Sequence, residues 1–145
     1  DLLAQMTAAR AEVPADMNAA VMVVDDDMFS RRAAVIALKK VQIKPVEMED
    51  PLVAVEQLDQ APFDLVIADV NMPGMSGFEL CKKIREGQMN HFTPVIFITV
   101  DGNFERRAQS VLSGGHGFIT KPYILMELAT RALGFVLQKH ARLQG

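Results

Sequence analysis

Short apolar runs that alternate with amphipathic segments constrain the fold of this chain more than any other feature. The residues at 21–24, 63–68 and 94–99 form largely apolar stretches, each closed by a polar residue. Short, mainly apolar runs of this kind are typical of strands that are buried on both faces. We therefore expect strands at these three places, and weaker extended runs predict two more, at 44–48 and 116–120.

The segments between these runs repeat their apolar residues at helical spacing. In the segment 28–41, Arg31 and Arg32 fall on the side that we assign to solvent. In the helix that begins at Pro51, the apolar side is expected to carry Leu52, Val55 and Leu58. Further helices are predicted at 78–86, 104–112 and 125–140, and a short leading helix at 1–13.

Strand and helix thus alternate five times along the 145 residues, a length that suits one hydrophobic core. Because right-handed crossover helices pack back onto a parallel sheet, this alternation predicts an α/β fold with helices on both faces of the sheet. The chain starts at Asp1 rather than methionine and stops at Gly145, soon after a helical pattern. We interpret it as a segment of a larger protein.

Composition excludes several classes of function. A net charge of −3 gives no general attraction to nucleic acid or to an anionic membrane surface. No apolar run approaches the ~20 residues of a membrane span. Cys81 is the only cysteine, so no internal disulfide can form and a reducing compartment is expected. We therefore expect a cytoplasmic protein whose residues here contact neither nucleic acid nor membrane.

Polar side chains gather where the predicted strands end. Asp25 and Asp26 close the first strand, Asp69 the third, Thr99 the fourth and Lys121 the fifth. Because the carboxyl ends of parallel strands share one edge, these groups are expected to line one crevice. Neighbouring carboxylates repel each other unless a cation joins them, and hard oxygen ligands without a Cys/His set suit Mg²⁺. The combination of a carboxylate nucleophile, Mg²⁺, an ammonium and a hydroxyl predicts phosphoryl transfer.

These motifs, in this order, resemble the receiver domains of two-component response regulators. The resemblance runs from residue 21 to about residue 140 and rests on Val23-Val24-Asp25-Asp26, Asp69 with Met72-Pro73-Gly74-Met75-Ser76-Gly77, Ile98-Thr99, and Lys121-Pro122. It implies a flavodoxin-like, doubly wound sheet of five parallel strands in the order 2-1-3-4-5. We assign 1–18 to a leading helix or linker, 19–142 to the receiver domain and 143–145 to a tail.

The resemblance also implies a role for each acidic residue. Asp69 corresponds to the phosphoacceptor, which takes a phosphoryl group from the phosphohistidine of a histidine kinase or phosphotransfer domain. Asp25, Asp26 and Asp69 correspond to the carboxylates that hold Mg²⁺, together with the backbone carbonyl of Asn71. Such a domain is not a conventional enzyme, because it catalyses only its own phosphorylation and dephosphorylation. The parent protein is expected to be a hybrid sensor kinase or a response regulator.

A second set of residues corresponds to the switch of such domains. Thr99 matches the hydroxyl residue that binds the new phosphoryl group, Phe118 the aromatic residue that follows it, and Lys121 the lysine that pairs with a phosphoryl oxygen. The Lys121-Pro122 peptide is expected to be cis. The output surface would comprise the helix at 104–112, the strand at 116–120 and the helix at 125–140, and a homodimer through this surface is one expectation. Exposed Met126 and Phe135 would suit a partner there, or would equally cover the edge of the core.

Some residues leave other interpretations open. Val100 stands where the family usually has alanine or glycine, and we expect its side chain to crowd the phosphoryl site. Asp27 is expected to cap the helix that follows it. One alternative function is a docking or dimerisation module that works without phosphorylation. A less favoured one is a haloacid-dehalogenase-type phosphatase, because Asp25-Asp26-Asp27 fits an acid-x-acid pattern; that alternative gives Asp69 no function.

Overall fold

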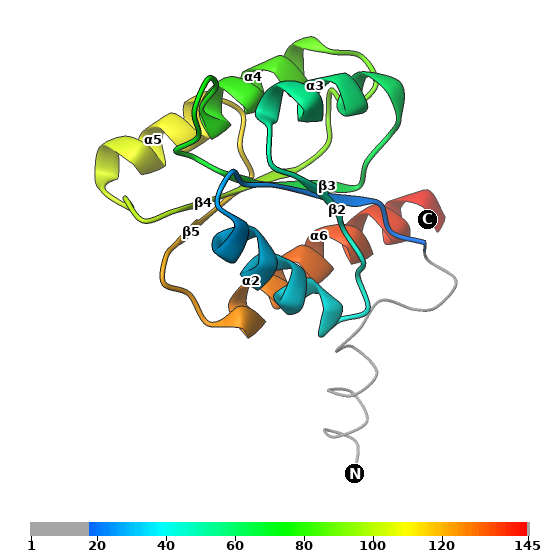
Figure 1. Ribbon diagram of the computed structural model, residues 1–145. Coiled ribbons are helices and arrows are strands. Elements are labelled where there is room, and N and C mark those ends of the chain that lie inside the picture. The colour runs from blue at the N-terminus through cyan, green and yellow to red at the C-terminus, as the bar shows by residue number, and fades with distance from the viewer. Residues whose placement is uncertain (1–17, 145) are drawn as a thin grey trace.

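Five parallel strands form one sheet in the order β2-β1-β3-β4-β5, as expected (Figure 1). The computed structural model describes residues 18–144. The helix predicted at 1–13 lies outside them. The strands are β1 (Val21–Val24), β2 (Val46–Met48), β3 (Leu65–Asp69), β4 (Val95–Thr99) and β5 (Gly117–Thr120).

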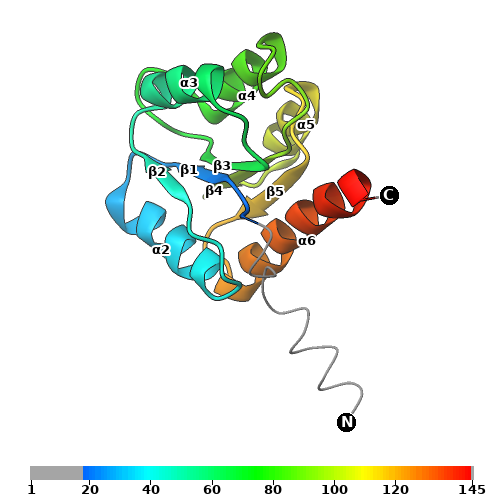
Figure 2. The same cartoon turned by 90° about the vertical axis from the view of Figure 1, so that its right-hand side faces the viewer.

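Helices cover both faces of the sheet. Figures 1 and 2 show α3, α4 and α5 on one face and α2 and α6 on the other. Their bounds are α2 (Met28–Lys39), α3 (Pro51–Gln60), α4 (Gly77–Glu86), α5 (Phe104–Leu112) and α6 (Leu125–Gln144). α2 ends two residues before the predicted limit of 41, and α6 extends four residues beyond the predicted limit of 140. No helix among residues 18–144 is long and apolar enough to cross a membrane.

The central strands are buried on both faces, which is why their sequence is apolar throughout. In β1, Val21 and Val23 belong to the core cluster that also contains residues of α2 and α6. Met22 and Val24 point into the other cluster, with residues of α3 and α4. Each side of the sheet therefore has its own hydrophobic core, and the five-stranded sheet separates the two.

Two details of the predicted helix faces are wrong. The buried residues of α3 are Pro51, Ala54 and Leu58, whereas Leu52 is 55% exposed. Positions 51, 54 and 58 share one side of a helix, and position 52 lies about 100° away from position 51. Arg31, which we assigned to solvent, has a side chain that is only 12% exposed because it is held by Glu47.

Candidate functional site

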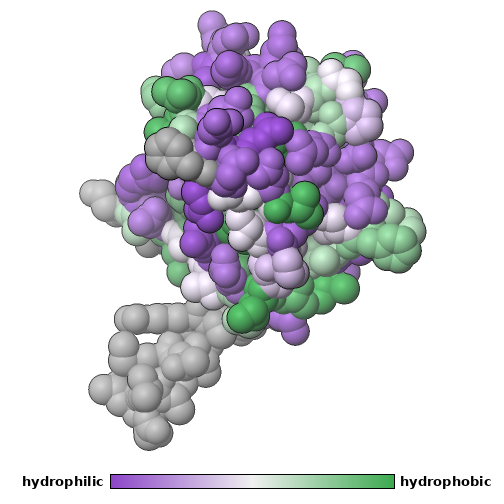
Figure 3. Space-filling model, turned by 90° about the vertical axis from the view of Figure 1, so that its left-hand side faces the viewer, coloured by the Kyte–Doolittle hydropathy of each residue, from purple (hydrophilic) through white to green (hydrophobic). Residues whose placement is uncertain are grey.

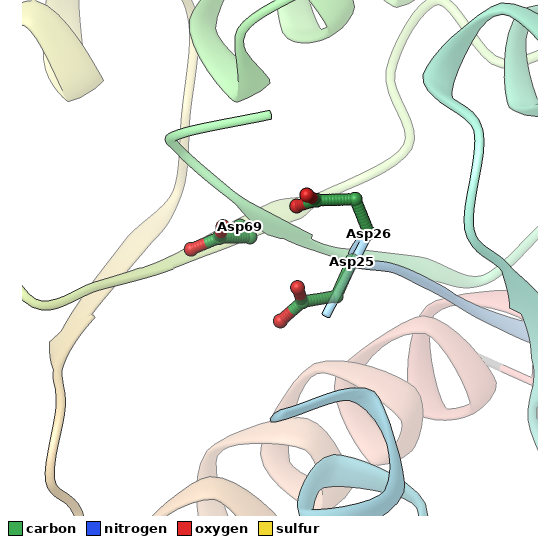
Figure 4. A group of neighbouring side chains, drawn as sticks. All are labelled: Asp25, Asp26 and Asp69. Carbon is green, nitrogen blue, oxygen red and sulfur yellow. The ribbon is translucent and has the colours of Figure 1, made fainter. Parts of the chain in front are cut away.

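Three carboxylates lie together at the edge of the sheet where the strands end. Asp25 and Asp26 follow β1, Asp69 is the last residue of β3, and one oxygen of each lies within 4.8 Å of the others (Figure 4). Asp25 and Asp69 are buried, and Asp26 is exposed. Figure 3 looks onto this edge of the molecule, whose surface is mainly hydrophilic with scattered apolar side chains. The predicted convergence of the acidic residues is correct.

Lys121 is the cation of this cluster. Its Nζ lies 3.4 Å from Oδ2 of Asp25 and 3.3 Å from Oδ1 of Asp69, so one ammonium pairs with two carboxylates. The residue directly follows β5, and its backbone N–H donates to the Thr99 carbonyl at 2.7 Å. The Lys121-Pro122 peptide is cis, as expected.

One ammonium does not balance the negative charge of the cluster. Burial, followed by the charge of Asp25, raises the pKa of Asp69 from 3.8 to about 6, although Lys121 acts in the opposite direction. The site therefore holds an ionised Asp69 at a cost in free energy, because its charged form is poorly solvated. A further positive charge between the carboxylates would remove much of that cost.

The donor set fits Mg²⁺. Carboxylate oxygens are the ligands that this ion prefers, and one or two carboxylates with open positions for water and phosphate oxygens are typical of its sites. Asp25, Asp26 and Asp69 supply such oxygens, and three carboxylates share the single ammonium of Lys121. Asn71 lies two residues after Asp69, so its backbone carbonyl stays the predicted fourth protein ligand.

Thr99 is fully buried at the end of β4 and is fixed by its neighbours. Its Oγ1 accepts a hydrogen bond from the Asn71 side-chain amide at 3.3 Å and another from the Asp101 N–H at 3.2 Å. The hydroxyl thus connects the loop after β3 with the loop after β4. A group that bound to this hydroxyl would act on both loops.

Phe118 lies outside the acidic cluster. It is half-buried on β5 and packs against the core cluster on the α4 side of the sheet. The guanidinium carbon of Arg107 lies 5.0 Å from the ring centroid, a cation–π distance, and Arg107 Nε also donates to the Gly102 carbonyl at 3.1 Å. Arg107 therefore links Phe118 to the loop that follows Thr99 at the end of β4.

The loop that follows Asp69 is closed tightly by Gly77. The Gly77 N–H donates to the Val70 carbonyl at 2.9 Å, and a side chain at position 77 would overlap the Asp69 carbonyl oxygen. Ser76 and Glu79 then form a capping box at the start of α4. The turn-rich sequence after β3 thus fixes the backbone of Asp69 itself.

Sequence reasoning missed Arg31 as part of this site. Its Nη1 donates to the Asp25 carbonyl at 2.9 Å and its Nε to Glu47 at 3.3 Å, so it anchors the backbone of the acidic pair. Helical spacing alone could not reveal this role, because the partners come from different elements. Asp27 caps α2 as predicted, and its own N–H donates to Asp25 Oδ1 at 3.0 Å.

Comparison with known proteins agrees with this geometry. Residues 21–133 match the family model described as the response regulator receiver domain. The chain belongs to this family. It is 34% identical over 107 residues to the chemotaxis protein CheY-3 of Vibrio cholerae, covering 73% of this chain and 82% of CheY-3.

Two further matches support the same family. The phosphate regulon transcriptional regulatory protein PhoB of Escherichia coli is 33% identical over 111 residues, which make up 77% of this chain but only 48% of PhoB. The chain therefore spans about half the length of that relative. The solved structure of the chemotaxis response regulator CheY4 of Vibrio cholerae superposes with a TM-score of 0.73 at 30% identity and covers 81% of this chain and 98% of that one. This protein is thus a receiver domain of a two-component system, and nothing in these matches supports the phosphatase alternative.

Proposed function

We propose that this receiver domain accepts a phosphoryl group on Asp69. The observation that carries the proposal is the shared position of Lys121, whose ammonium contacts both Asp69 and Asp25 at the end of the sheet. In the transfer, an Asp69 carboxylate oxygen forms a bond to phosphorus while the bond from phosphorus to the imidazole nitrogen of a phosphohistidine breaks. The histidine leaves as neutral imidazole after it takes up a proton.

The residues around Asp69 have distinct roles in this proposal. Lys121 would move its ammonium from the two carboxylates to a phosphoryl oxygen and neutralise part of the added charge. Thr99 would donate its hydroxyl hydrogen to another phosphoryl oxygen, which shifts its contacts with Asn71 and Asp101. Both residues act on the transferred group and are catalytic in that sense.

Asp25, Asp26, Asp69 and the backbone carbonyl of Asn71 would hold Mg²⁺ at this site. When bound, the ion neutralises the charge that develops on the phosphoryl oxygens. The protein then contributes the position of the nucleophile, and Arg31 contributes by fixing the backbone of Asp25.

The switch is proposed to run from Thr99 to Phe118 and so to the surface formed by α5, β5 and α6. Met126 is 45% exposed on this side, as expected for a contact residue, whereas Phe135 packs partly onto the core. We propose a histidine kinase or a phosphotransfer domain as the phosphoryl donor, a homodimer through this surface as one output, and the cytoplasm as the location. The parent is proposed to be a hybrid sensor kinase or a response regulator, with residues 19–142 as its receiver domain.

Intact-protein mass spectrometry tests the phosphoacceptor. The protein is incubated with a small phosphodonor, with and without Mg²⁺, and in parallel with a phosphorylated histidine kinase. We expect the mass of one phosphoryl group to appear only when Mg²⁺ is present and to vanish in Asp69→Asn. The matched control is Asp64→Asn, which changes a carboxylate at the opposite edge of the sheet and should leave uptake intact.

Two outcomes would contradict the proposal. A failure to take up phosphate from either donor by a folded protein would favour the docking or dimerisation module. Uptake that survives Asp69→Asn would place the phosphoacceptor elsewhere.

A further inference from the structure

A buried tyrosine hydroxyl without a partner lies on the loop that carries Lys121. Tyr123 follows Lys121 by two residues, between β5 and α6, and packs against the core cluster that contains residues of α2 and α6. Its hydroxyl oxygen is enclosed by protein and has no hydrogen-bond partner among the residues that the structure describes. Because leaving a buried hydroxyl unpaired costs free energy, such a group in a folded protein calls for an explanation.

The electrostatic surroundings of this hydroxyl point to Asp25. Burial, followed by the negative charge of Asp25, raises the pKa of Tyr123 to about 12, so the phenol keeps its hydrogen at neutral pH and can donate it. Lys121 ties the same loop to the acidic cluster, since its Nζ lies 3.4 Å from Asp25 Oδ2. A neutral donor thus lies within range of the charge of an anionic acceptor to which it is not bonded.

One oxygen of Asp25 depends on a cation that it shares. Its Oδ1 accepts from the Asp27 N–H at 3.0 Å. Its Oδ2 pairs with the Lys121 ammonium at 3.4 Å, and that ammonium also pairs with Asp69 at 3.3 Å. A second cation among the carboxylates would repel the ammonium of Lys121, because like charges at such short range oppose each other. Oδ2 of Asp25 would then need another donor.

We propose that the Tyr123 hydroxyl is a positioning donor for Asp25 when a divalent cation occupies the acidic cluster. With the ammonium of Lys121 displaced, the Asp25 carboxylate accepts a hydrogen bond from the phenol, which fixes its orientation towards the cation. Carboxylates that ligate a metal are themselves hydrogen-bonded by residues outside the ligand set, and loss of such a partner weakens metal binding. The inference rests on the proposed Mg²⁺ site and adds to it a residue that does not touch the cation.

The tyrosine itself reports on this hydrogen bond. The chain contains one tyrosine and no tryptophan, so its tyrosine absorbance and fluorescence arise from Tyr123 alone. A phenol that donates to a carboxylate absorbs at longer wavelength and fluoresces less than an unbonded phenol. We expect both changes when MgCl₂ is added to the full chain, with the same midpoint as Mg²⁺ binding measured by isothermal titration calorimetry.

Tyr123→Phe separates this role from a purely structural one. The variant keeps the ring and removes only the unpaired hydroxyl, so the metal-free protein should unfold at the same or a higher temperature. Its Kd for Mg²⁺ should nevertheless rise about tenfold, whereas loss of a hydroxyl that serves only packing would leave the Kd unchanged. Ile124→Ala changes the next residue of the same loop, whose side chain is 75% exposed, and should alter neither the Kd nor the tyrosine signal.

Asp64 provides a control carboxylate at the opposite edge of the sheet. Its Oδ2 accepts from the Ala20 N–H at 2.7 Å, and its Oδ1 pairs with Lys139 Nζ at 2.6 Å. Asp64→Asn should leave the response of the tyrosine signal to Mg²⁺ intact, whereas Asp25→Asn should abolish it. The two variants together show whether the response needs the carboxylate of Asp25.

Three results would overturn the proposal. The first is calorimetric binding of Mg²⁺ without a change in the tyrosine signal, which would leave the metal site standing and remove Tyr123 from it. The second is an unchanged Kd for Mg²⁺ in Tyr123→Phe. The third is a lack of Mg²⁺ binding by the unaltered chain, which would contradict the metal site itself, and the role of Tyr123 with it.

Discussion

Asp69, the proposed phosphoacceptor, carries a charge that the folded protein solvates poorly. Its pKa is raised from 3.8 to about 6, mainly by burial. Below pH 3.8 the carboxyl is protonated in both the folded and the unfolded chain, and its charge costs nothing. Between pH 3.8 and about 6 the Asp69 carboxyl ionises in the unfolded chain while it keeps its proton in the folded one, so the free energy of unfolding falls as the pH rises. Above pH 6 the carboxyl is ionised in both states and the loss is complete.

Asp69→Asn should therefore stabilise the metal-free protein, and more so at pH 7.5 than at pH 4.5. A shift of about two pKa units corresponds to about 3 kcal/mol at the upper pH. Urea unfolding at both pH values, with a chelator present, measures the difference. An equal effect of the substitution at the two pH values would show that the pKa of Asp69 is not raised in the folded chain.

Val100 follows the buried Thr99 and is itself 72% exposed. If Asp69 is the phosphoacceptor, this side chain would hinder the approach of a donor from solvent. We expect Val100→Ala to speed phosphorylation by a small donor about two- to fivefold, because an exposed isopropyl group is worth less than the 1.36 kcal/mol of a tenfold change. Initial rates of uptake by mass spectrometry test this, and unchanged rates would rule out steric hindrance by Val100.

Predictability from sequence differed among individual residues. The acidic residues, Thr99 and Lys121 could be placed because each ends a predicted strand, and the topology brings strand ends together. The role of Arg31 could not be predicted in this way. Its partner Asp25 follows β1 and its partner Glu47 lies in β2, whereas helical spacing indicates only which side of one helix a residue occupies. The contact of Arg107 with Phe118 was equally outside the reach of local patterns.

At the scale of elements, Arg31 connects α2 to the ends of β1 and β2. Arg31→Ala should lower the free energy of unfolding by about 1–3 kcal/mol, because it leaves the Asp25 carbonyl without its side-chain donor and removes the closer of the two guanidinium groups beside Glu47. Arg32 offers a matched control: it also faces Glu47, at 3.7 Å, but its side chain is 62% exposed. Arg32→Ala should cost at most about 1 kcal/mol. If urea unfolding gave equal losses of free energy for the two variants, the buried contacts of Arg31 would contribute no more stability than the exposed contact of Arg32.

The turn from β3 into α4 depends on Gly77. Gly77→Ala should destabilise the protein by about 2–3 kcal/mol or more, because the new methyl group meets the Asp69 backbone rather than a flexible side chain. Gly134→Ala is the control, since nothing lies within 4 Å of a side chain built there in α6. That change should stabilise the helix by about 0.5–1 kcal/mol. Thermal unfolding compares the two, and a neutral Gly77→Ala would mean that the loop relaxes easily.

The elements themselves were well predicted, and their ends less so. Val41 continues the apolar pattern of α2, but residues 40–42 form a turn, with Gln42 at a φ of 65°, because the chain must reverse towards β2. The strand predicted at 44–48 begins only at Val46, where pairing with Met22 starts. Periodicity shows which side of an element is apolar, whereas its ends depend on neighbours that are distant in sequence.

For the whole molecule, Mg²⁺ should act as a stabilising ligand. Binding only to the folded state adds about 2.7 kcal/mol when the free ion is at 100 times its Kd. The gain should be larger at pH 7.5 than at pH 4.5, where Asp69 keeps its proton, and it should vanish with a chelator. Differential scanning calorimetry measures it, and Asp25→Asn should reduce it. A Tm that does not respond to Mg²⁺ in the unaltered protein would contradict the metal site.

The contact between Ala20, Asp64 and Lys139 places the start of β1 beside the last turns of α6. The two ends of the folded unit therefore lie near each other, on the side of the sheet that carries no acidic residue of the site. A short artificial linker could join them, and new ends could be opened in an exposed loop. Circular permutation of this domain should leave its chemistry intact, because neither cut nor joint needs to touch the end of any strand that carries a reactive group.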